Sequence, residues 1–192
     1  MSEETKRRII EAGAKLIHQR GYNNTGLKDI LKAANVPKGS FYFYFENKEA
    51  FGIEIVNFYR EQFRGMVKGV LKDKNLSPIE RLQSILNTFH AYFKAQGYTQ
   101  GCPIGNLAQE MGDLSNPFRS KLKEAMDGMA SAFASILLDA QRMGEVPGDL
   151  NTRDASIFIV EAWHGAIIRM KVTKDDEALN LFNQFIFDKL LK

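Results

Sequence analysis

Apolar positions along the chain recur mostly three and four residues apart, which is the period of an amphipathic α-helix. Strict alternation of apolar and polar residues, the mark of a half-buried strand, is scarce. The pattern therefore predicts an all-α protein of about nine or ten helices. The expected helices span about residues 3–20, 27–34, 38–45, 48–71, 78–95, 103–111, 116–143, 152–172 and 175–191.

Local signals indicate where several helices begin. Ser77 is expected to cap a helix that has Pro78 at its first position and Glu80 at its third, which is the pattern of a capping box. Asn47 is expected to cap the fourth helix. We expect a three-helix domain over residues 1–50, and a helical bundle over residues 51–192 that a long helix joins to it.

Five consecutive aromatic residues, FYFYF at positions 41–45, occupy the third expected helix. On a helical wheel Phe41, Tyr44 and Phe45 share one face and are expected to pack inward. Tyr42 and Phe43 then face outward. The outward side also carries the residues that precede the run, Lys38, Gly39 and Ser40. Two short helices joined by a compact turn form the helix-turn-helix pattern, whose second helix enters the major groove of DNA.

The distribution of charge favours the same interpretation. Residues 1–50 carry nine Lys or Arg and six Asp or Glu, so their excess of three equals the net charge of +3 of the whole chain. A local basic excess suits a segment that binds phosphates, although an excess of three is a weak signal alone. From the pattern alone, the aromatic run could instead be only a buried helical core, with Lys38 as a solvated cap.

The stretch GYNNTGLKDILKAANVPKGSFYFYFENKEA, residues 21–50, resembles the DNA-binding domain of TetR-family transcriptional repressors, and the match covers about residues 6–52. The resemblance implies an all-helical homodimer that binds double-stranded palindromic operator DNA and that a small molecule or chemical signal releases. Carried over position by position, it implies DNA-facing roles for Thr25, Lys28, Lys38, Gly39, Ser40, Tyr42, Phe43 and Lys48. The family often has a polar residue at the position of Phe43, which here could contact a thymine methyl group or a sugar.

The chain has one cysteine, Cys102, so a disulfide within the chain is excluded. If Pro103 begins a helix, Cys102 lies at its N-cap, where the partial positive charge favours a reactive thiolate. The thiol is therefore a candidate sensor of electrophiles or oxidants. The alternative is that Cys102 is simply a small buried apolar residue.

The surrounding segment also resembles the NemR-like subgroup of the same family, which responds to electrophiles and oxidants. The matching residues are Gly101-Cys102, Leu107, Glu110, Asp113-Leu114-Ser115 and Arg119. The resemblance implies that Cys102 is the sensing residue and that Lys171 assists the switch.

A reversible pocket for an apolar ligand is the alternative to thiol chemistry. Its candidate lining consists of Phe89, His90, Phe93, Met126, Met129, Phe133, Trp163 and His164. Aromatic residues and methionines at helical spacing are also typical of a core, so the pattern alone does not decide between pocket and core. The spacing of the three histidines suggests no metal site, and no cofactor is expected.

The last two expected helices each carry more than one apolar side, which predicts more than one packing surface. We therefore expect a two-fold interface that takes these two helices from each copy of a homodimer. No nucleophile elbow, phosphate-binding glycine loop or HExxH motif is present, so an enzyme is not expected, and a small helical enzyme remains only a remote alternative. The charged N-terminus, the lack of a long apolar run and the single cysteine favour a cytoplasmic protein without a membrane span.

Overall fold

The computed structural model describes residues 2–192, and every regular element within them is a helix, which confirms the predicted all-α class. The chain forms two compact units. The first consists of residues up to 63 together with residues 103–125, and the second consists of residues 64–102 and 126–192. The first unit thus includes the predicted N-terminal domain and adds to it two later segments of the chain.

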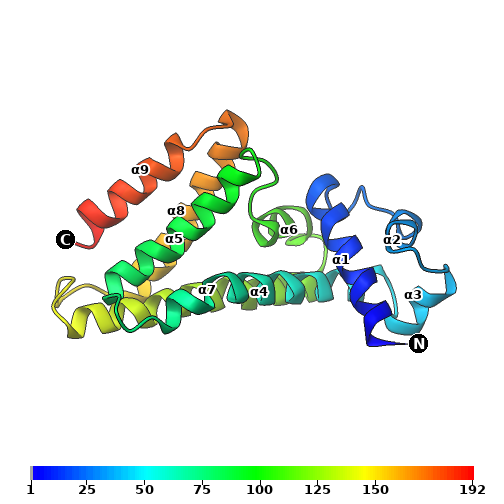
Figure 1. Cartoon of the computed structure of the whole chain (residues 1–192), viewed down its shortest axis with the longest axis horizontal. Helices are drawn as coiled ribbons and strands as arrows, with labels where there is room; N and C mark the ends of the chain where they lie inside the picture. The colour runs from blue at the N-terminus through cyan, green and yellow to red at the C-terminus, as the bar shows by residue number, and fades with distance from the viewer. Residues whose placement is uncertain (1) are drawn as a thin grey trace. The chain divides into compact units, whose positions relative to one another are not determined.

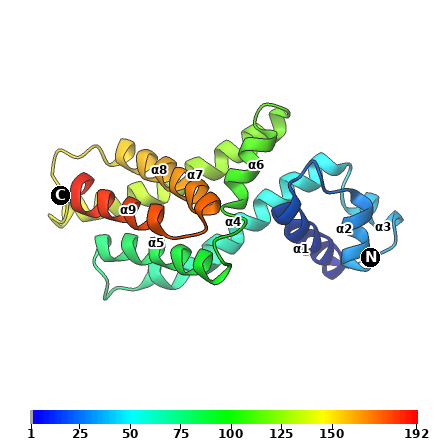
Figure 2. The same ribbon diagram turned by 90° about the horizontal axis from the view of Figure 1, so that it is seen from above.

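The first unit contains four complete helices and the beginnings of two longer ones. They are α1 (Glu3–Arg20), α2 (Leu27–Ala34), α3 (Gly39–Tyr44), α6 (Pro103–Met111), the start of α4 (Lys48–Lys72) and the start of α7 (Asn116–Arg142). Helices α1 and α2 pack against each other, as both views show (Figures 1 and 2). The predicted cap of α4 is confirmed, because Asn47 Oδ1 accepts a hydrogen bond from the Ala50 N–H at 2.8 Å.

A cluster of aromatic rings forms the core that holds α3 in place. Phe41 is fully buried, and its ring centre lies 5.2 Å from that of Phe45 and 5.5 Å from that of Phe51 on α4. Phe45 is also buried, so the predicted inward face is confirmed at both positions. Tyr44 is half-buried, and its hydroxyl donates to the Ser2 carbonyl at 3.0 Å. Burial of large aromatic area of this kind is a major source of stability in a small helical domain.

The second unit is built from α5 and the last helices of the chain. It contains α5 (Pro78–Ala95), α8 (Thr152–Thr173), α9 (Glu177–Phe185) and the remaining parts of α4 and α7. Helices α8 and α9 pack side by side (Figures 1 and 2). The predicted capping box of α5 is confirmed, since Ser77 N–H donates to Glu80 at 2.8 Å and Glu80 N–H donates to Ser77 Oγ at 3.3 Å.

The C-terminal helix differs from the uniform helix expected over residues 175–191. Helix α9 ends at Phe185 and continues as one wider π-helical turn, Ile186–Leu190. The Leu191 N–H donates to the Ile186 carbonyl at 3.0 Å, which is the five-residue hydrogen bond of such a turn. Among the described helices, none is long and apolar enough to cross a membrane.

Candidate functional site

Helix α3 presents two large aromatic side chains to solvent. Tyr42 is 61% exposed and Phe43 is 62% exposed, next to the exposed residues Lys38 and Gly39. A Cβ atom added at Gly39 would meet nothing within 4 Å, so packing within the chain does not require a glycine there. The outward face predicted from the helical wheel is confirmed for Lys38, Gly39, Tyr42 and Phe43, but not for Ser40, which is buried. A partner molecule could approach the backbone at Gly39 closely.

Two of the predicted DNA-facing residues lie inside the fold. Thr25 is fully buried, and its hydroxyl donates to the Gly21 carbonyl at 2.7 Å. Ser40 is 8% exposed. Thr25 comes just before α2, where its side chain closes the turn after α1, and Ser40 lies on the inner side of α3. Lys28 on α2 is exposed, in keeping with its predicted position on the surface.

Lys48 links the start of α4 to the turn between α1 and α2. Its Nζ atom donates to the Tyr22 carbonyl at 2.8 Å and lies 4.3 Å from the centre of the Tyr22 ring. Burial lowers the pKa of Lys48, while the negative charge of Glu110 acts in the opposite direction. An ammonium group has three donors, so this hydrogen bond occupies only part of its capacity to bind phosphate.

Glu110, near the end of α6, binds the backbone of the same turn. Its two carboxylate oxygens accept hydrogen bonds from the N–H groups of Tyr22 and Asn23, each at 3.1 Å. Gly21 is required here for two reasons. Its φ of 87° lies in the region that favours glycine, and a Cβ atom would come within 2.7 Å of a Glu110 oxygen. The carboxylate therefore fixes α6 to the turn that leads into the helix-turn-helix.

Apolar contacts support this polar link. The Tyr22 ring packs edge-on against Phe118 of α7, with 5.0 Å between ring centres. Gly52 on α4 leaves room for both rings, since a Cβ atom there would lie 2.3 Å from Phe118 Cζ. Burial, and after it the charge of Glu49, raises the pKa of Tyr22 to about 12. The segment that contains α6 and the start of α7 is thus packed firmly onto the turn after α1 and onto α4.

Cys102 lies in the second unit, directly before the first residue of α6, as the sequence predicts. It is 8% exposed, and His164 of α8 is its polar neighbour. The imidazole Nδ1 of His164 lies 2.8 Å from the Val160 carbonyl, while the buried Nε2 has no hydrogen bond of regular geometry. Cys102 and His164, called the thiol–imidazole pair below, are therefore neighbours that no regular hydrogen bond joins.

The electrostatics of this pair favour a charged imidazole. Burial alone would lower the pKa of His164. Three effects together outweigh burial and raise the pKa. They are the interaction with Cys102, which is not aligned as a regular hydrogen bond, the contact with the Val160 carbonyl and the charge of Glu161. The result is a raised pKa of His164, so a proton is held on this imidazole more readily than on an isolated one.

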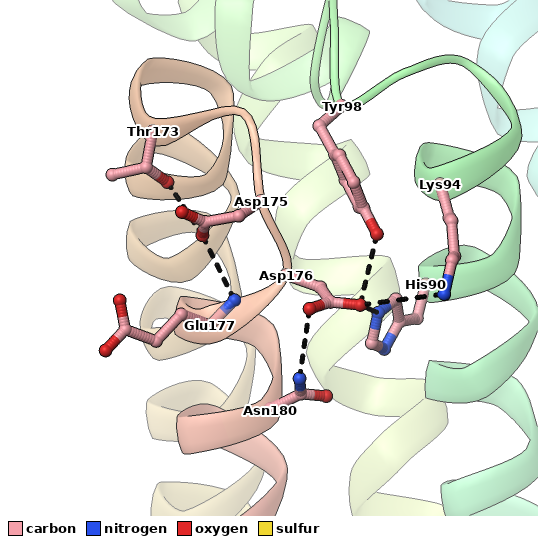
Figure 3. A network of polar contacts seen from close by, with 8 residues as sticks. All are labelled: His90, Lys94, Tyr98, Thr173, Asp175, Asp176, Glu177 and Asn180. Carbon is pink, nitrogen blue, oxygen red and sulfur yellow. Dashed lines mark hydrogen bonds and ion pairs between the residues drawn. The ribbon is translucent and has the colours of Figure 1, made fainter.

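The loop that leads to Cys102 has an unusual backbone, and hydrogen bonds to Asp176 help to hold it. Gly97, Tyr98, Gln100 and Gly101 all have positive φ, between 56° and 71°. Figure 3 shows how one oxygen of Asp176, at the start of α9, accepts hydrogen bonds from the Tyr98 hydroxyl at 3.1 Å and from His90 at 3.3 Å. These contacts tie the loop to the junction of α8 and α9, within the second unit.

The residues predicted to line a ligand pocket have mixed positions. Phe93 and Trp163 are buried, and the Trp163 ring packs at a tilt between those of Phe93 and Phe182, with ring centres at 6.3 and 5.1 Å. The other predicted pocket residues are half-buried, namely Phe89, His90, Met126, Met129, Phe133 and His164. Lys171, predicted to assist the switch, is exposed in the last turn of α8, and seven residues of helix place it about 10 Å along the axis from His164.

An apolar groove runs between α8 and α9. It has a volume of about 800 Å³. Three of its lining residues are large apolar side chains that are more than half exposed, namely Phe158, Leu181 and Phe185. Both of the helices predicted to form the dimer interface therefore carry uncovered apolar surface.

Sequence reasoning missed two contacts that organise these regions. One is the pair of hydrogen bonds from Glu110 to the turn before α2, which join residues separated by 88 and 87 positions in the chain. The other is the meeting of Cys102 with His164, which the sequence singled out only as a pocket residue. Pairings between distant residues leave no local pattern, whereas the exposed face of α3 follows from helical spacing alone.

Comparison with known proteins gives consistent matches over both units. Residues 9–55 match the family described as bacterial regulatory proteins, tetR family, and residues 78–186 match the family described as tetracyclin repressor-like, C-terminal domain. The HTH-type transcriptional repressor DhaR of Mycobacterium sp. strain GP1 is 33% identical over 189 residues, which cover 97% of this chain and 92% of DhaR.

Solved structures agree over nearly the full length. The regulatory protein TetR from Rhodobacter sphaeroides has a TM-score of 0.89 and 32% identity, with 96% of this chain and 97% of that chain covered. The reduced form of NemR from E. coli has a TM-score of 0.89 and 25% identity, with 97% and 96% covered.

Proposed function

Because this chain belongs to the TetR family of bacterial transcriptional regulators, we propose that it is a homodimeric repressor released from a palindromic operator by an effector. It is a regulator of transcription and not an enzyme.

The exposed face of α3 is the observation that carries the DNA-binding proposal. A helix of six residues offers Tyr42 and Phe43 to solvent, beside Lys38 and an unobstructed Gly39. Hydroxyl and ammonium donors position a protein on phosphates, and an aromatic edge can contact a thymine methyl group or a sugar. We propose that α3 lies in the major groove and that Lys48 binds a flanking phosphate.

Selection of binding sites from a random pool of duplex DNA tests this proposal without knowledge of the operator. We expect enrichment of a palindromic site, because a two-fold dimer reads two equivalent half-sites. Fluorescence anisotropy on the selected duplex should show affinity that falls linearly with salt concentration on a log–log scale. Equal affinity for the selected duplex and for a scrambled one would reject the proposal of a specific operator.

The groove between α8 and α9 supports a dimer built from these two helices. Large apolar side chains that are more than half exposed, such as Leu181 and Phe185, stabilise a dimer when a second copy covers them and removes their surface from water. We expect Phe185→Glu to shift the protein towards monomer in sedimentation at micromolar concentration. Val172→Glu is a matched control, since Val172 is 78% exposed but does not line the groove.

Covalent change at Cys102 is the release mechanism that we favour. Cys102 immediately precedes α6, and Glu110 near the end of α6 holds the N–H groups of Tyr22 and Asn23. An adduct on the sulfur would disturb the start of α6, and the same rigid helix would pass the disturbance to the turn before the helix-turn-helix. The relative NemR has been described in a reduced form, which supports testing oxidants as well as electrophiles.

Treatment of the DNA complex with N-ethylmaleimide or hypochlorite tests the release mechanism. We expect release from the wild type and no release from Cys102→Ser, because a serine hydroxyl does not react with either reagent under mild conditions. Equal release from both proteins would contradict the thiol mechanism. It would favour the second candidate, a reversible apolar ligand held among the half-buried side chains around Trp163.

A further inference from the structure

We propose that His164 is the base that activates Cys102 for addition to a small, uncharged α,β-unsaturated carbonyl compound. The inference rests on the proposed role of Cys102 as the sensing thiol, and it adds the residue that makes the thiol reactive and the chemical class of its reagent. It concerns the thiol–imidazole pair within the second unit.

The hydrogen bond to Val160 fixes which nitrogen of His164 acts as the base. A backbone carbonyl can only accept, so the Nδ1 atom at 2.8 Å from the Val160 oxygen must carry a proton. In the neutral imidazole the other nitrogen, Nε2, then holds the lone pair. Nε2 is buried and has no hydrogen bond of regular geometry, and Cys102 is the side chain whose interaction acts on this imidazole.

The surroundings stabilise the ion pair that proton transfer creates. When the Cys102 thiol gives its proton to Nε2, a thiolate and an imidazolium form side by side, with no change in net charge. The Val160 carbonyl accepts from the imidazolium, and Glu161 on the same helix contributes a negative charge. The raised pKa of His164 agrees with a site that favours the protonated ring.

The addition step balances without an oxidant or reductant. The thiolate sulfur forms a bond to the β-carbon of the unsaturated carbonyl compound, and the carbon–carbon π electrons move to the α-carbon and the carbonyl oxygen. The imidazolium then returns its proton to the α-carbon. The product is a thioether on Cys102 and a neutral His164, ready to hydrogen-bond Val160 as before.

Burial selects the class of electrophile. Cys102 is 8% exposed, and its neighbours Gly101, Pro103 and Ile104 are buried as well. A charged reagent would lose most of its hydration on approach, and the thiolate and imidazolium already compensate each other, so neither charge is left to offset that cost. A small neutral acceptor has no such cost, and acrylamide is a suitable probe.

The rate of Cys102 alkylation by acrylamide, followed by mass spectrometry of the intact full-length protein, tests the inference. We expect His164→Gln to react about 100-fold more slowly than the wild type near neutral pH, which is the contribution typical of a general base. His18→Gln is the control, since His18 is a half-buried histidine of the first unit whose ring packs against that of Tyr59, and it should react like the wild type.

The dependence of the rate on pH separates activation from a merely structural role. Between about pH 6 and pH 8 the rate in His164→Gln should rise about tenfold per pH unit, as for an isolated thiol. In the wild type the rate should change far less, because the imidazole takes up the proton within the pair. A steep isolated-thiol slope in the wild type overturns the inference, and so do equal rates in wild type and variant; the wild-type slope decides even if the variant does not fold.

Alkylation and DNA release are measured separately, so the two proposals fail in different ways. Fast alkylation of the wild type and slow alkylation of His164→Gln support the role of His164 even when the adduct leaves DNA bound, in which case only the release mechanism fails. Release by an adduct that forms equally fast in both proteins keeps Cys102 as the sensor and rejects His164 as its base.

Discussion

The proposed DNA-binding face and the thiol–imidazole pair are assembled in opposite ways. The face comes from one short segment, α3 and its flanks, and displays Tyr42 and Phe43 almost two-thirds exposed. The pair joins a loop residue to a residue of α8 and is largely shut off from water. A surface that must meet a large rigid partner can be exposed and local, whereas a reactive group that must avoid indiscriminate reaction is buried and needs a partner brought in by the fold.

The two regions also depend differently on the rest of the molecule. The orientation of α3 depends on the aromatic core that its own residues help to form. The position of Cys102 depends on a loop with four positive φ angles, held by Tyr98 and Asp176. We therefore expect substitutions to separate stability, DNA binding and sensing in a predictable order of effect.

The largest effect is expected at the inner side of the aromatic run. Phe41→Ala should lower the free energy of unfolding by about 3–5 kcal/mol, because it empties a fully buried site between Phe45 and Phe51. Phe43→Ala, two residues away and 62% exposed, should change it by less than about 0.5 kcal/mol. Chemical denaturation of both variants measures the difference, and similar losses would show that α3 does not have separate inner and outer faces.

A smaller loss is expected where α6 meets the turn after α1. Gly21→Ala forces a φ of 87° on a residue with a Cβ atom and brings that atom within 2.7 Å of Glu110. We expect a loss of about 1–3 kcal/mol in the free energy of unfolding. Glu110→Gln keeps the size of the side chain but weakens the two bonds to the N–H groups of Tyr22 and Asn23, and should cost less.

Glu110→Gln also addresses how release reaches the DNA. If α6 transmits the change at Cys102, the variant should bind operator DNA but respond less to N-ethylmaleimide. Alkylation of Cys102 itself should proceed as in the wild type. Unaltered release in Glu110→Gln would mean that the signal reaches the DNA-binding helices by another route.

DNA affinity should respond to the outer face with little change in stability. Tyr42→Ala and Lys48→Ala should each weaken binding to the selected operator by about tenfold, in line with the loss of one phosphate or base contact. Lys48→Ala should also reduce the dependence of affinity on salt, because the variant neutralises one phosphate fewer of the DNA backbone. Native circular dichroism is the control, and unchanged affinity in a folded variant would remove that residue from the interface.

The smallest effect is expected at the support of the thiol loop. The hydrogen bond from Tyr98, followed by that from His90, lowers the pKa of Asp176 below its ordinary value. A carboxyl group with a lowered pKa in the folded state stabilises the fold above its ordinary pKa of about 4, and this contribution is lost as the pH falls through the lowered value. Thermal melting of wild type and Asp176→Asn should therefore differ slightly at neutral pH and converge in acid.

A difference in melting temperature that is the same at neutral and acid pH would show that Asp176 acts by shape and not by charge. Tyr98→Phe is the companion variant, because it removes the first cause of the lowered pKa and leaves the ring in place. The melting temperature of Tyr98→Phe should depend on pH less strongly than that of the wild type, but the dependence should persist because His90 still contacts Asp176.

Local patterns predicted the helices, several caps and the two faces of α3, since each depends on residues within a few positions of one another. The position of Cys102 before α6 was predicted for the same reason, from the proline that follows it. The buried hydroxyl of Thr25, which donates to the Gly21 carbonyl, was not indicated by any local pattern, since its expected role came from the family resemblance. The partners of Glu110 and Cys102 come from distant parts of the chain, and only the folded packing brings them together.

The hydrogen bonds that join α6 and α4 to the turn after α1 are made to main-chain atoms. Glu110 accepts from the N–H groups of Tyr22 and Asn23, and Lys48 donates to the Tyr22 carbonyl. Such bonds are indifferent to which side chains follow in α2 and α3, provided that a glycine remains at position 21. On the proposed function, α2 and α3 could accordingly be exchanged for those of another operator specificity while the proposed sensor stays attached, as in the construction of new chemically controlled gene switches.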